Sequence, residues 1–129
     1  DSNIPMYVAG SDHPNKGPAQ RLLRQVQAGR LTACSSTEVL QEILYRYSAI
    51  GRLDLGIEIY DLFVQICPDI LDVTLADTDR ARDLLVDQTD LSARDAVHAG
   101  VMLNHDVQRI ATFDTGFDRV PGIERVELI

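Results

Sequence analysis

The sequence predicts an α/β fold in which helices cover both faces of a central parallel sheet. Short apolar segments that favour strands alternate along the chain with longer segments of helical periodicity, which is the pattern of a parallel sheet. The chain has 129 residues and contains no repeat or low-complexity linker, so residues 1–129 are expected to form one domain. A composition of 45% hydrophobic and 25% charged residues excludes disorder, collagen-like repeats and a coiled-coil rod.

The first third of the chain predicts two helices and a strand. Residues 2–9 favour a short helix, in which Pro5 has to lie in the first turn. After a polar loop, residues 18–28 have the periodicity of an amphipathic helix, and Gly29 ends it. Residues 31–35 are predicted to form a short buried strand.

A helical hairpin follows. The segment Ser35-Ser-Thr-Glu38 has the spacing of a capping box that opens a helix to about residue 50. A second helix is expected over residues 52–66, and it carries two apolar stripes: Leu53, Ile57, Tyr60 and Val64, and Leu55, Ile59, Leu62 and Ile66. One stripe satisfies the core of a monomer. The second indicates an interface with another subunit or a partner, unless the whole helix is buried in the monomer.

The rest of the chain again alternates between strands and helices. Strands are predicted over residues 70–75, 109–113 and 123–128, and an acidic helix over residues 77–88. The segment Ser92-Ala-Arg-Asp95 has the spacing of a second capping box, which opens a nearly all-apolar helix to about residue 105. Functional sites of parallel sheets lie beyond the carboxyl ends of the strands, so residues that follow these strands are candidates for function.

Two aspartates stand where a surface acid is not expected. Asp114 directly follows the strand over residues 109–113, although Asp114-Thr-Gly116 is also ordinary turn chemistry. Asp95 lies on a helix with few polar residues, and helix capping is the simple explanation for it. A carboxylate on that face is costly to bury unless the helix N-terminus or a bound cation compensates its charge.

Glu42 and Asp1 are the other acidic candidates. Glu42 flanks the apolar stripe of its helix, whereas Glu38 points away from the stripe and is explained by capping. The alternative for Glu42 is an exposed ion pair with Arg46. Asp1 is a strand-end carboxylate if an apolar strand precedes it. Arg46 and Arg94 lie near these acids and are candidates for contacts with them or with a phosphate.

Carboxylates that converge in one cleft cannot all ionise without a counter-charge. Hard oxygen ligands select Mg²⁺ or Mn²⁺ rather than zinc. Such a site activates water and neutralises the charge of a phosphate under in-line attack. The three histidines and two cysteines form no recognisable ligand set for another metal, and His98 is expected to be a hydrogen-bonded residue at the rim of the cleft.

Four segments of the sequence resemble the PIN-domain family, and more narrowly its VapC-type toxin ribonucleases. They are Asp1-Ser-Asn3, Ser36-Thr-Glu-Val-Leu-Gln-Glu42, Leu91-Ser-Ala-Arg-Asp95-Ala-Val-His98-Ala and Ala111-Thr-Phe-Asp114-Thr-Gly-Phe-Asp118. The last two are the more specific. The resemblance spans nearly the whole chain and implies a single PIN domain, a three-layer α/β/α sandwich.

The resemblance also implies an activity and a set of site residues. Asp1, Glu42, Asp95 and Asp114 match the acidic quartet of the family, and Asp118 matches a further acid that often accompanies the fourth. Asn3 and Thr112 occupy positions where the family places polar supporting groups. Proteins of this family use Mg²⁺ or Mn²⁺ to cleave RNA, usually as homodimers, and a partner antitoxin blocks the site. The sequence departs from the family in lacking an apolar central strand before Asp1, and roughly four to six such residues are expected there.

The net charge of −8 argues at first against a nucleic-acid ligand. Part of this charge belongs to the predicted site, where metal cations would offset it, and residues 69–95 alone hold eight aspartates. We therefore expect weak non-specific RNA binding and attraction for a basic antitoxin segment. Two alternatives remain: a non-catalytic PIN-fold interaction module, and, less well supported, a receiver-like domain, for which Lys16 is the only lysine.

The sequence also predicts a compartment. Cys34 and Cys67 are the only cysteines, too few for a disulfide-rich secreted scaffold, and both are expected to be buried free thiols. No signal peptide is visible, and no apolar run approaches the length of a membrane span. A cytoplasmic protein without a membrane partner is expected.

Overall fold

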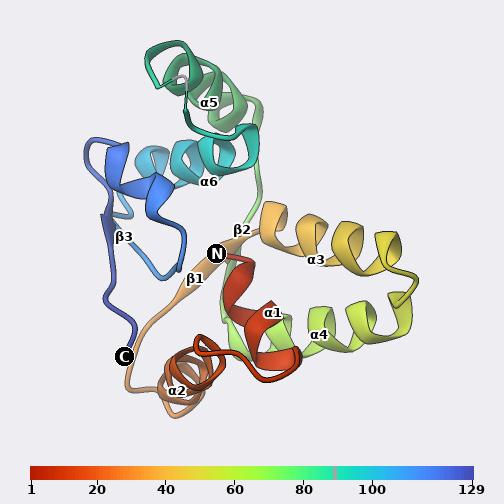
Figure 1. The fold of residues 1–129 in the computed structure, drawn as a ribbon. Coiled ribbons are helices and arrows are strands. Elements are labelled where there is room, and N and C mark those ends of the chain that lie inside the picture. The colour runs from red at the N-terminus through yellow and green to blue at the C-terminus, as the bar shows by residue number, and fades with distance from the viewer. Residues whose placement is uncertain (89) are drawn as a thin grey trace.

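The structure, a computed structural model, describes residues 1–88 and 90–129. It is an α/β fold of helices around short parallel strands (Figure 1). The elements in chain order are α1 (Asn3–Ala9), α2 (Lys16–Gln27), β1 (Cys34–Ser36), α3 (Thr37–Ala49), α4 (Leu53–Ile66), β2 (Asp69–Leu71), α5 (Leu75–Asp87), α6 (Ala93–Asn104), β3 (Arg109–Ile110), the 3₁₀ helix η1 (Thr115–Arg119) and β4 (Glu124–Arg125). The alternation of helices and parallel strands that the sequence predicts is confirmed.

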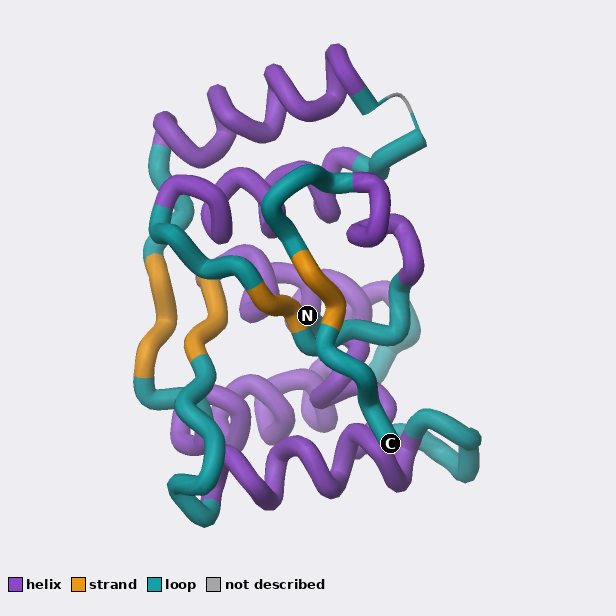
Figure 2. The backbone as a smooth tube through the Cα atoms, turned by 90° about the vertical axis from the view of Figure 1, so that its left-hand side faces the viewer, coloured by secondary structure: helices purple, strands orange, loops and turns teal. Residues whose placement is uncertain are grey.

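The strands form two parallel pairs (Figure 2). Cys34 in β1 lies opposite Asp69 in β2, and Arg109 in β3 lies opposite Glu124 in β4. A cavity of about 510 Å³ is lined by residues of β1, β3 and the chain around them. The predicted strands over residues 31–35, 70–75, 109–113 and 123–128 were too long, because each strand pairs with a single neighbour over only two or three residues.

Two apolar clusters form the core, one on each side of the site residues described below. The first joins α5 and α6 to η1 and the last strands, with Phe117 and Ala99 fully buried. The second joins α3 to α4, with Ile43 fully buried. Glycines allow close helix contacts in both: a Cβ on Gly56 would lie 2.7 Å from Tyr47 Cβ, and a Cβ on Gly100 would lie 2.6 Å from the Asp77 carbonyl oxygen.

The helix starts differ from the predicted ones at two places. Ser36, not Ser35, is the N-cap of α3, and its side chain makes no capping hydrogen bond. The hydroxyl of Thr37 instead accepts a hydrogen bond from the backbone N–H of Val73, which ties the start of α3 to the chain after β2. The predicted capping box there was wrong. Ser92 does cap α6, because its hydroxyl accepts a hydrogen bond from the backbone N–H of Asp95.

The structure contains one capping box that was not predicted from the sequence. Thr74 caps α5, and the Asp77 carboxylate accepts a hydrogen bond from the Thr74 backbone N–H. The helix therefore begins at Leu75 rather than at the predicted residue 77. Asp77 is buried and also accepts a hydrogen bond from the side chain of Asn104 in α6, so a single carboxylate caps one helix and joins it to the next.

Helix α4 is not buried all round. Ile59 and Phe63 belong to the core, while Leu53, Ile57 and Leu62 are exposed. The alternative that this helix is buried more deeply in the monomer is wrong. The prediction of an interface on α4 stays a prediction. Cys67 is buried as expected, but Cys34 is exposed, and both thiols are free. Among the described helices, none has the length and apolar character needed to cross a membrane.

Candidate active site

Four carboxylates that the sequence singled out are carried by four separate elements. Asp1 precedes α1, Glu42 lies on α3, Asp95 lies in the first turn of α6, and Asp114 caps η1. The structure arranges them as two neighbouring pairs. Asp1 and Glu42 lie beside His98, and Asp95 faces Asp114.

Asp1 is held by the segment that follows β3. Its backbone nitrogen donates a hydrogen bond to the carbonyl oxygen of Ala111 at 3.1 Å. Its Oδ2 accepts hydrogen bonds from Thr112 Oγ1 at 2.6 Å and from Asn3 Nδ2 at 3.1 Å, and its Oδ1 accepts one from the Ser2 backbone N–H. With three donors, the Asp1 carboxylate has a fixed orientation.

Thr112 connects the two pairs. It is 1% exposed, and its hydroxyl accepts hydrogen bonds from Asn3 Nδ2 and from the backbone N–H of Asp114, both at 3.0 Å, while it donates to Asp1. Asn3 and Thr112 thus lie where supporting groups were predicted. The Oδ1 of Asn3 is buried and makes no hydrogen bond with any described residue, so this oxygen is available to a ligand.

Glu42 is buried and paired. His98 Nε2 lies 2.7 Å from its Oε1, and the Ser2 hydroxyl donates a hydrogen bond to its Oε2. Burial alone would raise the pKa of Glu42, but the hydrogen bonds from His98 and Ser2, with the charges of His98 and Arg94, together lower it. The alternative of an exposed pair between Glu42 and Arg46 is wrong, since Glu42 is 6% exposed and Arg46 points to solvent.

Asp95 and Asp114 are neighbours in the site. A Cβ built on Gly116 would lie 3.1 Å from Asp114 Oδ1 and 3.7 Å from Asp95 Oδ2, so both carboxylates border the same small space. Burial raises the pKa of Asp95, and the negative charge of Asp114 raises it further. The capping and turn roles considered for these residues are also present: the Asp95 backbone N–H is capped by Ser92, and Asp114 accepts a hydrogen bond from the Gly116 backbone.

The residues fit a divalent cation. Asp95 and Asp114 present oxygens to each other beside a glycine that leaves room for a ligand, and burial together with the negative charge of Asp114 raises the pKa of Asp95. Ligand atoms of Asp1, Glu42 and His98 also lie within 4.8 Å of one another. This set is mainly carboxylate oxygen, which suits Mg²⁺ or Mn²⁺. His98 contributes a nitrogen only if it leaves its hydrogen bond with Glu42.

Three other predicted residues lie outside this cluster. Both carboxylate oxygens of Asp118 accept hydrogen bonds from Arg125, at 2.6 and 2.9 Å, and this pairing lowers the pKa of Asp118. The Arg94 guanidinium lies over the ring of Tyr45, 4.9 Å from its centroid. Arg46 is exposed on α3.

Three residues lie closer to the site than the sequence predicts, or make contacts that it does not predict. His98 was expected at the rim, yet it is 5% exposed and bonded to Glu42. The available signal was spacing, because His98 follows Asp95 by three residues and therefore shares its helix face. Glu38 makes no capping bond and is half-buried, and burial raises its pKa. Nothing in the sequence pointed to Ser2, which follows Asp1 and bonds to Glu42.

Comparisons with known proteins agree with this geometry. Residues 1–123 match the family model of the PIN domain. Ribonuclease VapC13 of Mycobacterium tuberculosis and a VapC ribonuclease of Mycobacterium bovis are each 44% identical to the chain over 126 residues, which is 98% of this chain and 96% of each relative. Ribonuclease VapC23 of Mycobacterium tuberculosis is 34% identical over 117 residues, 88% of this chain and 90% of the relative.

Solved structures share the fold. One is the structure of VapBC2 from Rickettsia felis bound to a DNA fragment from its promoter. A chain of that structure superposes on this protein with a TM-score of 0.78 at 18% sequence identity. The match covers 100% of this chain and 96% of the other. Mycobacterium tuberculosis VapC20, a toxin that cleaves the sarcin–ricin loop, superposes with a TM-score of 0.71 at 20% identity, over 88% of this chain and 86% of its own.

Proposed function

The chain belongs to the PIN-domain family, and on this basis we propose that it is a VapC-type toxin: a metal-dependent endoribonuclease that a cognate antitoxin neutralises. The observation that carries the proposal is the pair of acids beside His98, Asp1 and Glu42, together with the neighbouring pair of Asp95 and Asp114. The ribonuclease names of its relatives at 44% identity support the same activity.

Asp95 and Asp114, with Asp1 and Glu42 beside them, would hold Mg²⁺ or Mn²⁺. When bound, the ion supplies an acidic water and a counter-charge for the phosphate. The chain itself supplies orientation. Thr112 fixes the Asp1 carboxylate and the backbone of Asp114, and the pairing with His98 favours the ionised form of Glu42. These contacts form the site in advance of the substrate, so little reorganisation accompanies binding.

The proposal includes two protein partners and a compartment. An antitoxin with a basic segment would be attracted by the net charge of −8. A homodimer would bury the exposed apolar face of α4, including Leu53 and Ile57. RNA is the substrate, and the cytoplasm, where RNA is available, is the site of action.

The decisive experiment is RNA cleavage by the purified protein with Mg²⁺ or Mn²⁺, with and without EDTA. We expect cleavage that EDTA abolishes and that Asp95→Asn reduces by at least about a thousandfold. Asp79→Asn, an exposed aspartate on α5, is the matched control and should cleave as the wild type does. Cleavage that persists in EDTA or in Asp95→Asn would overturn the mechanism. A folded protein that binds partners but cleaves no RNA would instead be the interaction module.

A further inference from the structure

We propose that Tyr45 and Arg94 form a substrate-binding pair beside the acidic cluster: a base of single-stranded RNA stacks on Tyr45, and the Arg94 guanidinium contacts an adjacent phosphate. This inference rests on the proposed function and specifies how its substrate is held. Both are positioning residues for RNA, and neither has a part in activating water.

The first argument is the position of the pair. Tyr45 lies three residues after Glu42 on α3, and Arg94 lies four residues before His98 on α6. Residues at these spacings share a helix face. The exposed pair of Tyr45 and Arg94 therefore lies one helical turn outward from the buried hydrogen bond between Glu42 and His98.

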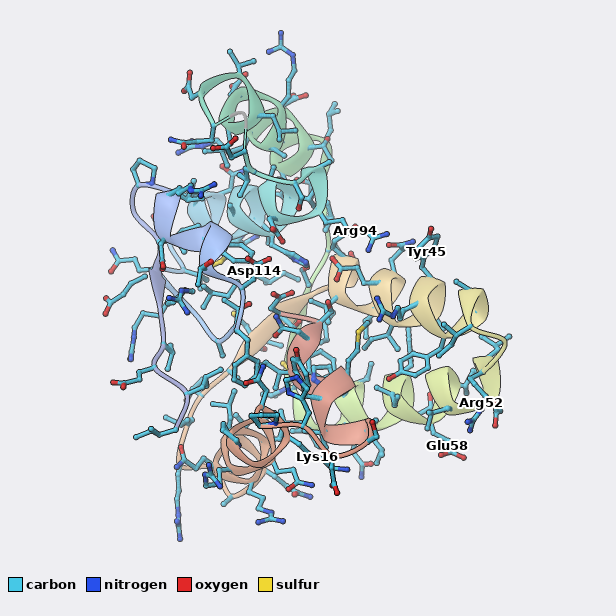
Figure 3. The ribbon with its side chains drawn as sticks, in the orientation of Figure 1. Lys16, Tyr45, Arg52, Glu58, Arg94 and Asp114 are labelled. Carbon is cyan, nitrogen blue, oxygen red and sulfur yellow. The ribbon has the colours of Figure 1, made fainter. Side chains whose placement is uncertain are left out.

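The pair lies at the edge of the acidic cluster, on the side of α3. Arg94 is the neighbour of Asp95 in the chain, and its positive charge lowers the pKa of Glu42. Figure 3 shows Arg94 and Tyr45 next to each other where the start of α6 approaches α3, with Asp114 on the side of η1. The guanidinium therefore lies on the α3 side of the acidic cluster, close enough to Glu42 to act on its charge.

The second argument is chemical. Arg94 covers one face of the Tyr45 ring at 4.9 Å, yet Tyr45 is 55% exposed. The other face of the ring is open to a base, and stacking of bases on aromatic rings, assisted by arginine, is how proteins bind single-stranded nucleic acid. In a chain of net charge −8, binding of a polyanion needs positive charge close to the site. Arg94 supplies positive charge on the α3 side of the acidic cluster, near Glu42.

Steady-state cleavage tests the pair. We expect Tyr45→Ala to raise KM for single-stranded RNA about fivefold or more and to change kcat less than twofold. Tyr45→Phe keeps the ring and should restore KM. Arg94→Ala should raise KM and flatten its dependence on salt, since it removes one phosphate contact. A purely structural contact between α3 and α6 would predict lower thermal stability and an unchanged KM.

A direct measurement is available because the chain contains no tryptophan. Tyr45→Trp in the Asp95→Asn background places one indole at the proposed stacking position. We expect random 12-nucleotide single-stranded RNA to quench its fluorescence in a saturable manner, and Arg94→Ala to weaken that titration about fivefold. Val86→Trp, at an exposed position of α5, is the control and should not be quenched.

The outcomes separate this inference from the proposed function. If the wild type cleaves RNA but Tyr45→Ala has the same KM, or the two tryptophans respond alike, the pair does not bind substrate and the nuclease assignment stands. If Tyr45→Trp is quenched but no RNA is cleaved, the pair binds RNA and the nuclease assignment fails. If RNA is neither cleaved nor bound, both fail.

Discussion

His98 Nε2 lies 2.7 Å from Glu42 Oε1, and both side chains are shielded from solvent. A carboxylate in such a place is stable only with its partner, so this bond links the fold to the site. It also joins α6, which carries Asp95, to α3, which carries Glu42.

Replacing His98 by Ala should destabilise the protein by about 3 kcal/mol, because it leaves a buried carboxylate without its main partner. His98→Gln retains a hydrogen-bond donor and should therefore lose less stability than His98→Ala. Urea unfolding at pH 7 measures both. Equal unfolding midpoints for the wild type and His98→Ala would show that the bond contributes nothing.

The same pair has a pH dependence with a defined sign. The folded-state pKa of Glu42 lies below its ordinary value of 4.5, so its contribution to stability is complete above pH 4.5 and is lost as the pH falls through the folded-state pKa. The free energies of unfolding of the wild type and His98→Ala should therefore differ most near neutral pH and become similar in acid. A difference in these free energies that grows below pH 4 would contradict the predicted sign.

The contribution of Asp95 to stability should change with pH in the opposite direction to that of Glu42. Its pKa is raised from 3.8 by burial and by Asp114, so in EDTA its charge reduces stability above the folded-state pKa, and the penalty is relieved as the pH falls. Asp95→Asn should accordingly raise the melting temperature in EDTA at pH 7. Addition of Mg²⁺ or Mn²⁺ should raise the melting temperature of the wild type but not the melting temperature of Asp95→Asn. Scanning calorimetry measures both. A variant less stable than the wild type in EDTA would contradict the pairing of the two aspartates.

Gly116→Ala should weaken metal binding about tenfold with little loss of stability. The added Cβ would lie 3.1 Å from Asp114 Oδ1, in space that a ligand of the two carboxylates needs. Isothermal titration with Mn²⁺ measures the effect. Gly17→Ala is the control, since its Cβ would approach only the flexible side chain of Arg21. If both variants bind Mn²⁺ as the wild type does, the space beside Gly116 is not part of the metal site.

Asp77→Ala should destabilise the protein by about 1–2 kcal/mol, because it removes the capping box of α5 and the bond from Asn104. The pKa of Asp77 is lowered from 3.8, so this loss too should shrink as the pH falls below that value. Asp79→Ala, exposed on the same helix, should change stability by less than about 0.5 kcal/mol. Chemical denaturation of the two variants side by side is the test.

Local patterns predicted the helices well and the strands poorly. Helices α3, α4 and α6 begin and end within about two residues of their predicted positions, because apolar periodicity and punctuating glycines and prolines act over a few residues. Strand ends depend on which chain segment lies alongside, and that is not encoded locally. The expected apolar strand before Asp1 stays a prediction.

The acidic residues of the candidate site were predicted from the sequence, but the hydrogen bonds that orient them were not. Strand-end and helix-start positions identified Asp95 and Asp114 as unusual. The connections run through Ser2, His98 and Thr112, whose partners lie 40, 56 and 111 residues away. Such pairings follow from the tertiary fold, so a single sequence shows the acids more readily than the groups that orient them.

The hydrogen bond from Thr112 to Asp1 also has a consequence in time. During translation Asp1 emerges from the ribosome long before Thr112, its hydrogen-bond donor, which lies 111 residues further along the chain. Asp114, the last of the four, emerges later still. Translation products that stop before Thr112 lack the assembled constellation, so a ribonuclease built this way becomes active only after Asp114 has been synthesised and the two distant segments have met.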